Sequence, residues 1–295
     1  MQNWRKILFK EKAVKYTLAA AASMSILIVL LIFTFLGKEA FGFLYEPGLK
    51  ELFHTRWMPV SSQRESFGLV PLICGSLLVT TMATIIMIPF GVGASVYIAE
   101  LAKPRERETL KPFIEILACI PSVVIGFFGL LIIVPMVKKV FGLQSGYNAL
   151  SGAILLALMA IPTVISISED AIRSVPKDYK SASLALGASK MQTVWRVIVP
   201  AALPGIITAV MLGIGRVIGE TMAVMMVTGN SALITGNPTE SVRTMTATIA
   251  AEMGEVPFGS THYKALFCVG IVLLIATFIL NLIAFKILKK YRMIG

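Results

Sequence analysis

Long apolar runs alternate with short polar and basic segments along the whole chain. The hydrocarbon core of a bilayer is about 30 Å thick, and roughly 20 helical residues cross it. Six runs are this long, at residues 17–37, 70–99, 112–137, 149–168, 205–227 and 265–285. The pattern predicts an all-α integral membrane protein with six transmembrane helices. We expect a short cytoplasmic N-terminus, residues 1–16, ahead of a single transmembrane domain, residues 17–295.

Prolines lie inside several of these runs. Proline lacks a backbone N–H and clashes with the preceding turn, but membrane helices tolerate it where neighbouring groups take up the freed carbonyls. We therefore expect bends or breaks at Pro89, Pro121 and Pro162.

The basic residues divide unequally between the two ends of the predicted helices. With both termini inside, eighteen of the 27 lysines and arginines lie in inner segments, eight in outer ones and one, Arg216, inside a helix. The outer eight are Lys38, Lys50, Arg56, Arg64, Lys138, Lys139, Arg243 and Lys264. Cytoplasmic loops retain an excess of lysine and arginine. The distribution predicts a multi-pass protein with both termini in the cytoplasm.

The composition argues against several soluble functions. The chain is 56% hydrophobic and 15% charged, with a mean hydropathy of +0.81, whereas soluble domains carry about a quarter charged residues. The net charge of +11 is not gathered into the patch that a nucleic-acid surface needs. The three cysteines lie inside apolar runs, and His54 and His262 stand singly. We expect no disulfide framework, no metal site and two surface histidines.

One polar segment, residues 169–204, separates the fourth and fifth predicted helices, and we call it the long loop. Residues 177–186 are rich in helix formers, Gly187 suits a C-cap, and Ser189 can cap a second helix that Pro200 is expected to stop. This predicts two short helices joined by a tight glycine turn. The loop holds more apolar residues than a free loop needs, so we expect it to dock on another protein or on the membrane surface.

The long loop resembles the coupling loop of binding-protein-dependent ABC import permeases, the MetI-like family. In that family the loop rests in a cleft of a separate ATPase subunit and carries the pattern Glu-Ala-Ala, three residues, Gly, nine residues, then Ile-x-Leu-Pro. The matching positions here are Ser181, Ala182, Ser183, Gly187, Ala188 and Pro200, with serine in place of the glutamate. The chain has no GxxxxGK[ST] phosphate loop. We expect no cofactor or catalytic residue in this chain, and ATP to be bound by partner subunits.

The fifth predicted helix carries charge at its centre. Arg216 lies at the midpoint, with Glu220 one turn further on. An arginine at that depth costs roughly 2.5 to 3.5 kcal/mol, so such residues usually mark a pathway. One alternative is a purely structural pair on one helix face. An arginine fork suits an oxyanion, and we hypothesise that Glu220 holds Arg216 until the substrate competes for it.

A polar stripe on the second predicted helix accompanies this pair. Ser76, Thr80 and Thr84 are four residues apart and share a face. They either line the same path or bond back to carbonyls of their own helix, and the second explanation is slightly favoured.

Three stretches resemble the C-type permease subunit of phosphate importers (PstC). They are Phe67-Gly68 with Pro71-Leu72-Ile73, residues 115–126, and Gly215-Arg216-Val217-Ile218-Gly219-Glu220-Thr221-Met222. The resemblance implies phosphate import across the inner or plasma membrane of a prokaryote. It also implies a second, PstA-like permease, two PstB-like ATPase subunits and an external PstS-like phosphate-binding protein.

Other functions stay open at this point. A permease for phosphonate, sulfate or molybdate would use the same arginine chemistry. A membrane enzyme acting on lipid phosphates needs a nucleophile or metal site that the sequence does not offer, and a passive channel has no use for a coupling loop. The outer segments 38–69 and 229–264, the latter with an amphipathic helix around Met245, Ile249 and Met253, either touch a binding protein or cap the bundle.

Overall fold

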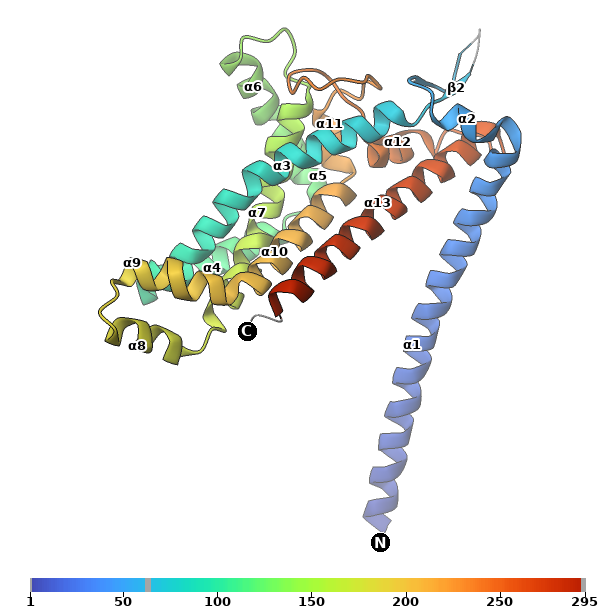
Figure 1. Cartoon of the computed structure of the whole chain (residues 1–295). Helices are drawn as coiled ribbons and strands as arrows, with labels where there is room; N and C mark the ends of the chain where they lie inside the picture. Colours follow the sequence, from blue (N-terminus) through green and yellow to red (C-terminus); the bar gives the residue numbers. More distant parts are fainter. Residues whose placement is uncertain (1, 62–64, 293–295) are drawn as a thin grey trace.

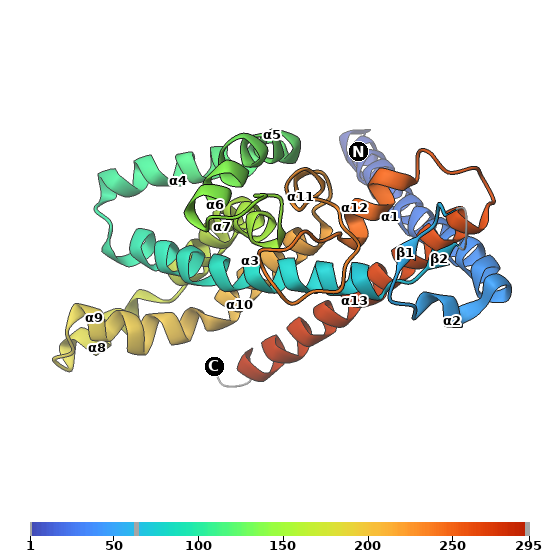
Figure 2. The ribbon, with the colours of Figure 1, turned by 90° about the horizontal axis from the view of Figure 1, so that it is seen from above.

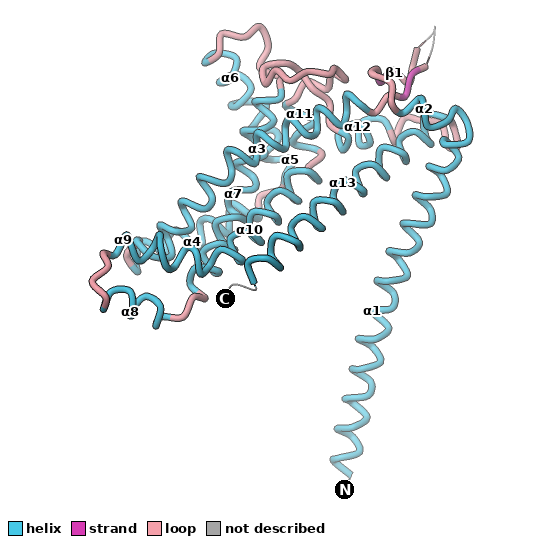
Figure 3. Tube along the Cα trace, in the orientation of Figure 1, coloured by secondary structure: helices cyan, strands magenta, loops and turns pink. Residues whose placement is uncertain are grey.

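Helices make up nearly the whole structure, together with one two-stranded hairpin (Figure 3). The computed structural model describes residues 2–61 and 65–292, so Arg64, one of the expected outer basic residues, lies outside the described part. The elements before the long loop are α1 Gln2–Phe43, η1 Leu44–Gly48, α2 Leu49–Leu52, β1 Trp57–Met58, β2 Ser66–Phe67, α3 Val70–Val96, η2 Tyr97–Leu101, α4 Pro104–Cys119, α5 Ser122–Phe128, η3 Gly129–Ile133, α6 Val134–Val140 and α7 Ala149–Arg173. They are followed by α8 Lys177–Ala185, α9 Lys190–Thr193, η4 Val194–Ile198, α10 Val199–Gly219, α11 Met222–Val227, α12 Met245–Glu252 and α13 Thr261–Arg292, where η marks a π-helical turn.

Six helical segments are long and apolar enough to cross a membrane within the described part of the chain, which confirms the predicted fold class. They are Val14–Leu52, Val70–Leu101, Ser122–Val140, Ala149–Arg173, Lys190–Gly219 and Thr261–Lys289.

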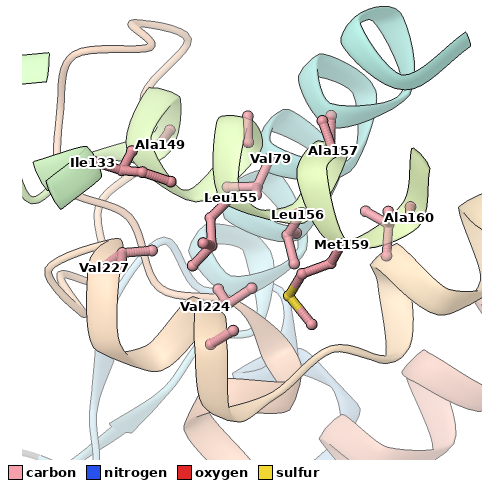
Figure 4. Close-up of a cluster of buried hydrophobic side chains, with 14 of the residues drawn as sticks. Val79, Ile133, Ala149, Leu155, Leu156, Ala157, Met159, Ala160, Val224 and Val227 are labelled. Carbon is pink, nitrogen blue, oxygen red and sulfur yellow. The ribbon is translucent and has the colours of Figure 1, made fainter. Parts of the chain in front are cut away.

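Helix α7 lies at the centre of the bundle and packs most extensively against α3 and α10. Its buried face carries Leu155, Leu156 and Met159, which meet Val79 of α3 and Val224 of α11 in one apolar cluster (Figure 4). This burial explains why the fourth predicted helix is the most enclosed of the six.

Two glycines allow the central helices to approach closely. A Cβ at Gly91 of α3 would lie 2.8 Å from Cγ1 of Val164, and one at Gly213 of α10 would lie 2.7 Å from Cγ2 of the same valine. Such distances are far inside van der Waals contact, so both positions require glycine for α7 to fit between α3 and α10.

The first helix stands away from the bundle (Figure 1). Residues 14–35 of α1 are exposed, and the helix meets α13 near its C-terminal end, where the rings of Phe35 and Phe267 contact edge-on at 5.5 Å between centroids. Both described chain ends lie toward the side of the bundle that carries α8 and α9, which we call the α8 end (Figure 1). The opposite end carries α12 and the β-hairpin, and we call it the α12 end. Seen from above, the N-terminal end lies well apart from α8 and α9 (Figure 2).

The third transmembrane helix begins later than predicted. Helix α4 ends at Cys119, Ile120 is extended (φ −65°, ψ 130°), and the span runs over Ser122–Val140 rather than 112–137. The break expected at Pro121 is confirmed. The start was misplaced because the second half of α4 is apolar and leads into the span without a polar boundary.

The other prolines interrupt less than expected. Helices α3 and α7 continue through Pro89 and Pro162, so no break occurs at either. The prediction that Pro200 stops a helix is wrong, because the helical run Lys190–Gly219 passes through it. The wide turn η4 comes directly before it, and Val199 N donates to Val194 O there. Such a π-turn accommodates the proline ring and its missing donor.

Candidate functional site

The fifth transmembrane helix is interrupted next to its charged residues. Helix α10 ends at Gly219, Glu220 is extended (φ −70°, ψ 131°), and α11 begins at Met222. Oε1 of Glu220 accepts a hydrogen bond of 3.3 Å from Ala223 N in the first turn of α11. The expectation that Arg216 and Glu220 share one helix face is therefore wrong, because the helix ends between them. Arg216 lies in the last turn of α10 and not at the midpoint of a continuous span over 205–227 as predicted.

Arg216 has a hydroxyl partner in place of the expected carboxylate. Its Nη1 donates to Oγ1 of Thr163, on α7, at 3.1 Å, and the side chain is half-buried. Within the described residues no ion pair joins Arg216 to Glu220 or to any other acid, so the resting contact of our competition hypothesis is not present in this structure. A guanidinium has five N–H donors. Most of these donors therefore bond to no other residue that the structure describes.

Space is open beside this arginine. A Cβ placed on Gly215 or Gly219 would meet no atom of the described chain within 4 Å, apart from those of its chain neighbours and of its own helix backbone. The α10 face that carries these glycines is therefore uncovered at the depth of Arg216. Thr163 was not picked out from the sequence, although a hydroxyl one residue after Pro162, in the middle of an apolar run, is a signal that could have identified it.

The polar stripe of α3 divides into two parts. Oγ of Ser76 accepts a hydrogen bond of 2.9 Å from Met245 N, at the start of α12. Thr80 and Thr84 are half-buried, and their hydroxyls bond to no other residue that the structure describes. The back-bonding explanation is wrong for all three residues, and only the two threonines keep free hydroxyls for a path.

The first helix and the glycine turn predicted for the long loop are present, but the second helix is not short, because it continues from Lys190 to Gly219. Helix α8 ends at Ala185, and Gly187 has φ +85°, a left-handed conformation that glycine adopts without strain. Ala188 N donates to Ser183 O across the turn. Ser189 then begins α9 with a capping box, since its Oγ accepts from Gln192 N while Oε1 of Gln192 accepts from Ser189 N.

The long loop has one buried face and one exposed face. Val194 and Ile198 are buried in an apolar cluster between the ends of α3, α7 and α10. Leu186 and Trp195 are exposed, at 89% and 54%. Ser181 and Ala182 on α8 are also exposed, and so is Pro200 on α10. The exposed apolar face is available to a partner, as the sequence indicated.

Two polar contacts fix α8 to the rest of the protein. Lys180 Nζ lies 2.5 Å from Oε2 of Glu100 in η2, the last turn of the second transmembrane helix. Ser183 is the third residue of the triplet that aligns with Glu-Ala-Ala. Its hydroxyl forms a hydrogen bond with Oγ1 of Thr193 at 2.9 Å. These contacts join α8 to the end of the second transmembrane helix and to α9.

A buried ion cluster at the α8 end was missed by the sequence analysis. Glu169 of α7, 1% exposed, pairs with Arg107 Nη2 and Lys111 Nζ of α4, both at 2.8 Å, and with Arg173 at 3.6 Å. Asp170 accepts from the same Lys111 Nζ at 2.7 Å. Hydrogen bonds to Asp170 and then to Glu169 raise the pKa of Lys111 above its usual value. The cluster fastens α4 to α7.

The outer loop elements cap the bundle at the α12 end. The amphipathic helix expected around Met245 and Ile249 is α12, whose residues Met245 to Thr248 are buried. His54 is exposed as predicted. His262 is less exposed than predicted: its side chain is 13% exposed, and Nε2 lies 2.8 Å from Oε2 of Glu252.

Sequence comparison agrees with these features. The family model described as binding-protein-dependent transport system inner membrane component matches residues 88–292. The chain is 39% identical over 227 residues to the probable ABC transporter permease protein YqgH of Bacillus subtilis, covering 77% of this chain and 73% of that protein. It is 30% identical over 262 residues to the phosphate transport system permease protein PstC of Mesorhizobium japonicum, covering 82% and 79%.

Solved structures show the same fold. A permease chain of a bacterial ABC transporter that imports alginate aligns with a TM-score of 0.64 at 14% identity, covering 96% of this chain and 98% of its own. The inward-facing MetNI methionine transporter aligns with a TM-score of 0.56 at 20% identity, covering 76% and 94%.

Proposed function

The chain belongs to the family of binding-protein-dependent transport system inner membrane components, and from this premise we propose that it is a permease subunit of an ATP-driven phosphate importer. The chain would form half of the translocation pathway, and a second, PstA-like permease would form the other half. The 30% identity to a phosphate permease over most of the chain supports this substrate.

The state of Arg216 is the observation that carries the proposal. The guanidinium lies within the fifth transmembrane helix, with a hydroxyl as its protein partner and an uncovered helix face beside it. A charge held at such depth without an acid is costly unless a ligand or water uses it. A planar fork with free donors matches two oxygens of a phosphate. Thr163 orients the fork, and Thr80 and Thr84 add hydroxyl donors along α3.

We place the α8 end in the cytoplasm. Both described chain ends lie there, and the positive-inside rule favours that side for the segments with most basic residues (Figure 1). The exposed Leu186 and Trp195 of the long loop would then dock in a cleft of a PstB-like ATPase subunit. Lys180 and Glu100 would carry the movement of the docked loop into α3.

The serine at position 181 alters this dock. In the family pattern a glutamate stands there, whereas Ser181 donates its hydroxyl to Asp178 O at 3.1 Å within α8. The ATPase partner would therefore meet a neutral position, and the apolar face of the loop would supply more of the contact.

The proposal is tested by uptake in proteoliposomes that contain the assembled transporter, its ATPase subunits, internal ATP and an external phosphate-binding protein. We expect radiolabelled phosphate to accumulate and ATP omission to abolish the accumulation. Excess unlabelled sulfate or molybdate should leave the rate unchanged.

Two other results would change the assignment. Uptake of sulfate, molybdate or phosphonate in place of phosphate would contradict the substrate and leave the importer assignment intact. Phosphate movement that continues without ATP would contradict the importer.

A further inference from the structure

A single carboxylate joins four separate segments at the α12 end. Oε1 of Glu252, the last residue of α12, accepts from Arg243 Nη1 at 2.6 Å, and Oε2 lies 2.8 Å from Nε2 of His262 at the start of α13. Nε1 of Trp57, in β1, donates to both oxygens at 3.1 and 3.2 Å. We call these four side chains the Glu252 cluster.

The cluster is enclosed and holds the outer hairpin firmly. Trp57 is 4% exposed, and its ring meets those of Phe67 and His262 edge-on, both at 6.1 Å between centroids. A Cβ at Gly68 would lie 2.0 Å from His54 O, so only glycine fits at this position directly after β2. The hairpin and Glu252 therefore move together.

The other end of α12 touches the interruption of the fifth transmembrane helix. Oγ1 of Thr246 donates to Glu220 O at 2.8 Å, and Met245 N donates to Oγ of Ser76 at 2.9 Å. An eight-residue helix is about 12 Å long. Helix α12 thus connects the hairpin at one end to the backbone of Glu220 at the other.

A second connection runs from the cluster to α11. Nε of Arg243 donates to Asn230 O at 2.9 Å, and Nδ2 of Asn230 donates to Met225 O in the last turn of α11. A Cβ at Gly75 of α3 would lie 2.4 Å from Arg243 O, so this arginine is also tightly packed against the second transmembrane helix. Glu220 is therefore connected to Glu252 through α12, and α11 is connected to it through Asn230 and Arg243.

The surface above the cluster is open. A cavity of about 760 Å³ lies there, and Glu252, Glu255, Val60 and His262 are among its lining residues. The rim is apolar and strongly exposed at Val60, 85%, and close by at Phe258, 79%. A protein that docks on this face would press on the hairpin and on the cluster directly.

We propose that Glu252 is a positioning residue that passes contact at the outer hairpin to the interruption beside Glu220. The inference rests on the proposed function, which places the α8 end in the cytoplasm and so leaves the α12 end to face an external binding protein. Apolar packing alone would stabilise these segments as well as a buried ion cluster does. The charges fix one arrangement of hairpin, α12 and α13, and docking shifts that arrangement as a unit.

The experiment measures ATP hydrolysis by the assembled transporter in proteoliposomes, with and without phosphate-loaded binding protein. Coupling networks of this kind carry about 0.5–2 kcal/mol, so we expect Glu252→Ala to lower stimulation by the binding protein about fivefold. Hydrolysis without binding protein should stay at the wild-type rate. Trp57→Phe, which removes one donor and keeps an aromatic ring, should lower stimulation about twofold.

Glu240→Gln is the matched control, because Glu240 is an exposed acid that does not line this cavity. Its stimulation should equal that of the wild type. The inference is overturned if Glu252→Ala and Trp57→Phe keep full stimulation, or if both lower the two hydrolysis rates by the same factor, which would be a structural effect alone. A wild-type transporter that does not respond to phosphate-loaded binding protein would refute the proposed function, and this inference with it.

Discussion

Glu169 and Arg216 are both charged residues on transmembrane helices, and their surroundings differ sharply. Glu169 lies at the α8 end with three cations around it, two of them at 2.8 Å. Arg216 lies deeper, with one hydroxyl at 3.1 Å and open space at the neighbouring glycines. The first charge is paired with cations of the protein, and the second has donors to spare. Pairing therefore separates a charge that holds the fold from a charge that serves a ligand.

The largest expected effect concerns the satisfied charge. Glu169→Gln leaves Arg107 and Lys111 without their buried partner, and breaking such a pair costs about 3–5 kcal/mol of unfolding free energy. Thermal unfolding of the purified protein in detergent measures this loss. Asp170→Asn is the control, because Asp170 is 63% exposed and pairs only with Lys111, so its change should stay below about 1 kcal/mol. Equal stability of the two variants would contradict the structural role of Glu169.

A second prediction concerns the planar shape of the Arg216 guanidinium, which has no acidic partner in the described part of the chain. Arg216→Lys keeps the charge and loses the planar fork, so we expect phosphate uptake to fall about tenfold while thermal stability stays unchanged. Radiolabelled uptake per assembled complex measures the change. Arg105→Lys, an exposed substitution on α4, is the control. Full uptake by Arg216→Lys would show that the site needs only a positive charge.

A smaller effect is expected at Thr163, the hydrogen-bond partner of the Arg216 guanidinium. Thr163→Val removes one hydrogen bond from a half-buried guanidinium, and water can replace the lost hydroxyl there. We therefore expect roughly a fivefold change, which corresponds to the ~1 kcal/mol that a typical hydrogen bond contributes. The loss should fall on the uptake rate at low phosphate more than on the maximum rate. Thr208→Val is the matched control on α10, because the Thr208 hydroxyl bonds to Pro204 O of its own helix. Identical uptake by the two valine variants would remove Thr163 from the site.

The smallest effect concerns pH. Hydrogen bonds to Asp170 and Glu169 raise the pKa of Lys111 above its usual 10.5. A lysine whose pKa is raised by folding contributes stability that is complete below the unfolded pKa and is lost as pH rises through the folded value. The stability difference between wild type and Lys111→Met should therefore be constant below about pH 10 and shrink above it. A difference that changes between pH 6 and 9 would contradict this assignment.

The six transmembrane helices followed from the sequence because length and apolarity alone decide them. The glycine turn at Gly187 was also predictable, since a left-handed residue between two helix-forming segments favours glycine. The break after Gly219 was not predictable, because an apolar run contains no local signal that separates a continuous helix from two halves. It is accompanied by a contact between Thr246 and Glu220, which are far apart in the sequence.

The partners of the charged residues could not be predicted either. Arg107 and Lys111 are more than fifty residues from Glu169 in the sequence. Arg216 of α10 bonds to Thr163 of the neighbouring α7. Spacing on one helix suggested Glu220 as the partner of Arg216, and tertiary packing gave a different one. The sequence identifies which residues carry charge, whereas the fold decides which of these charges are paired.

The account depends most directly on Arg216 being free for substrate. The decisive measurement is radiolabelled phosphate uptake by the reconstituted transporter with Arg216→Gln, normalised to assembled complexes and compared with the wild type. The account predicts that uptake is lost while membrane insertion, ATPase assembly and thermal stability remain at wild-type levels. Unchanged uptake would contradict it, and so would a loss of stability like that of Glu169→Gln, because Arg216 would then belong to the fold and not to the path.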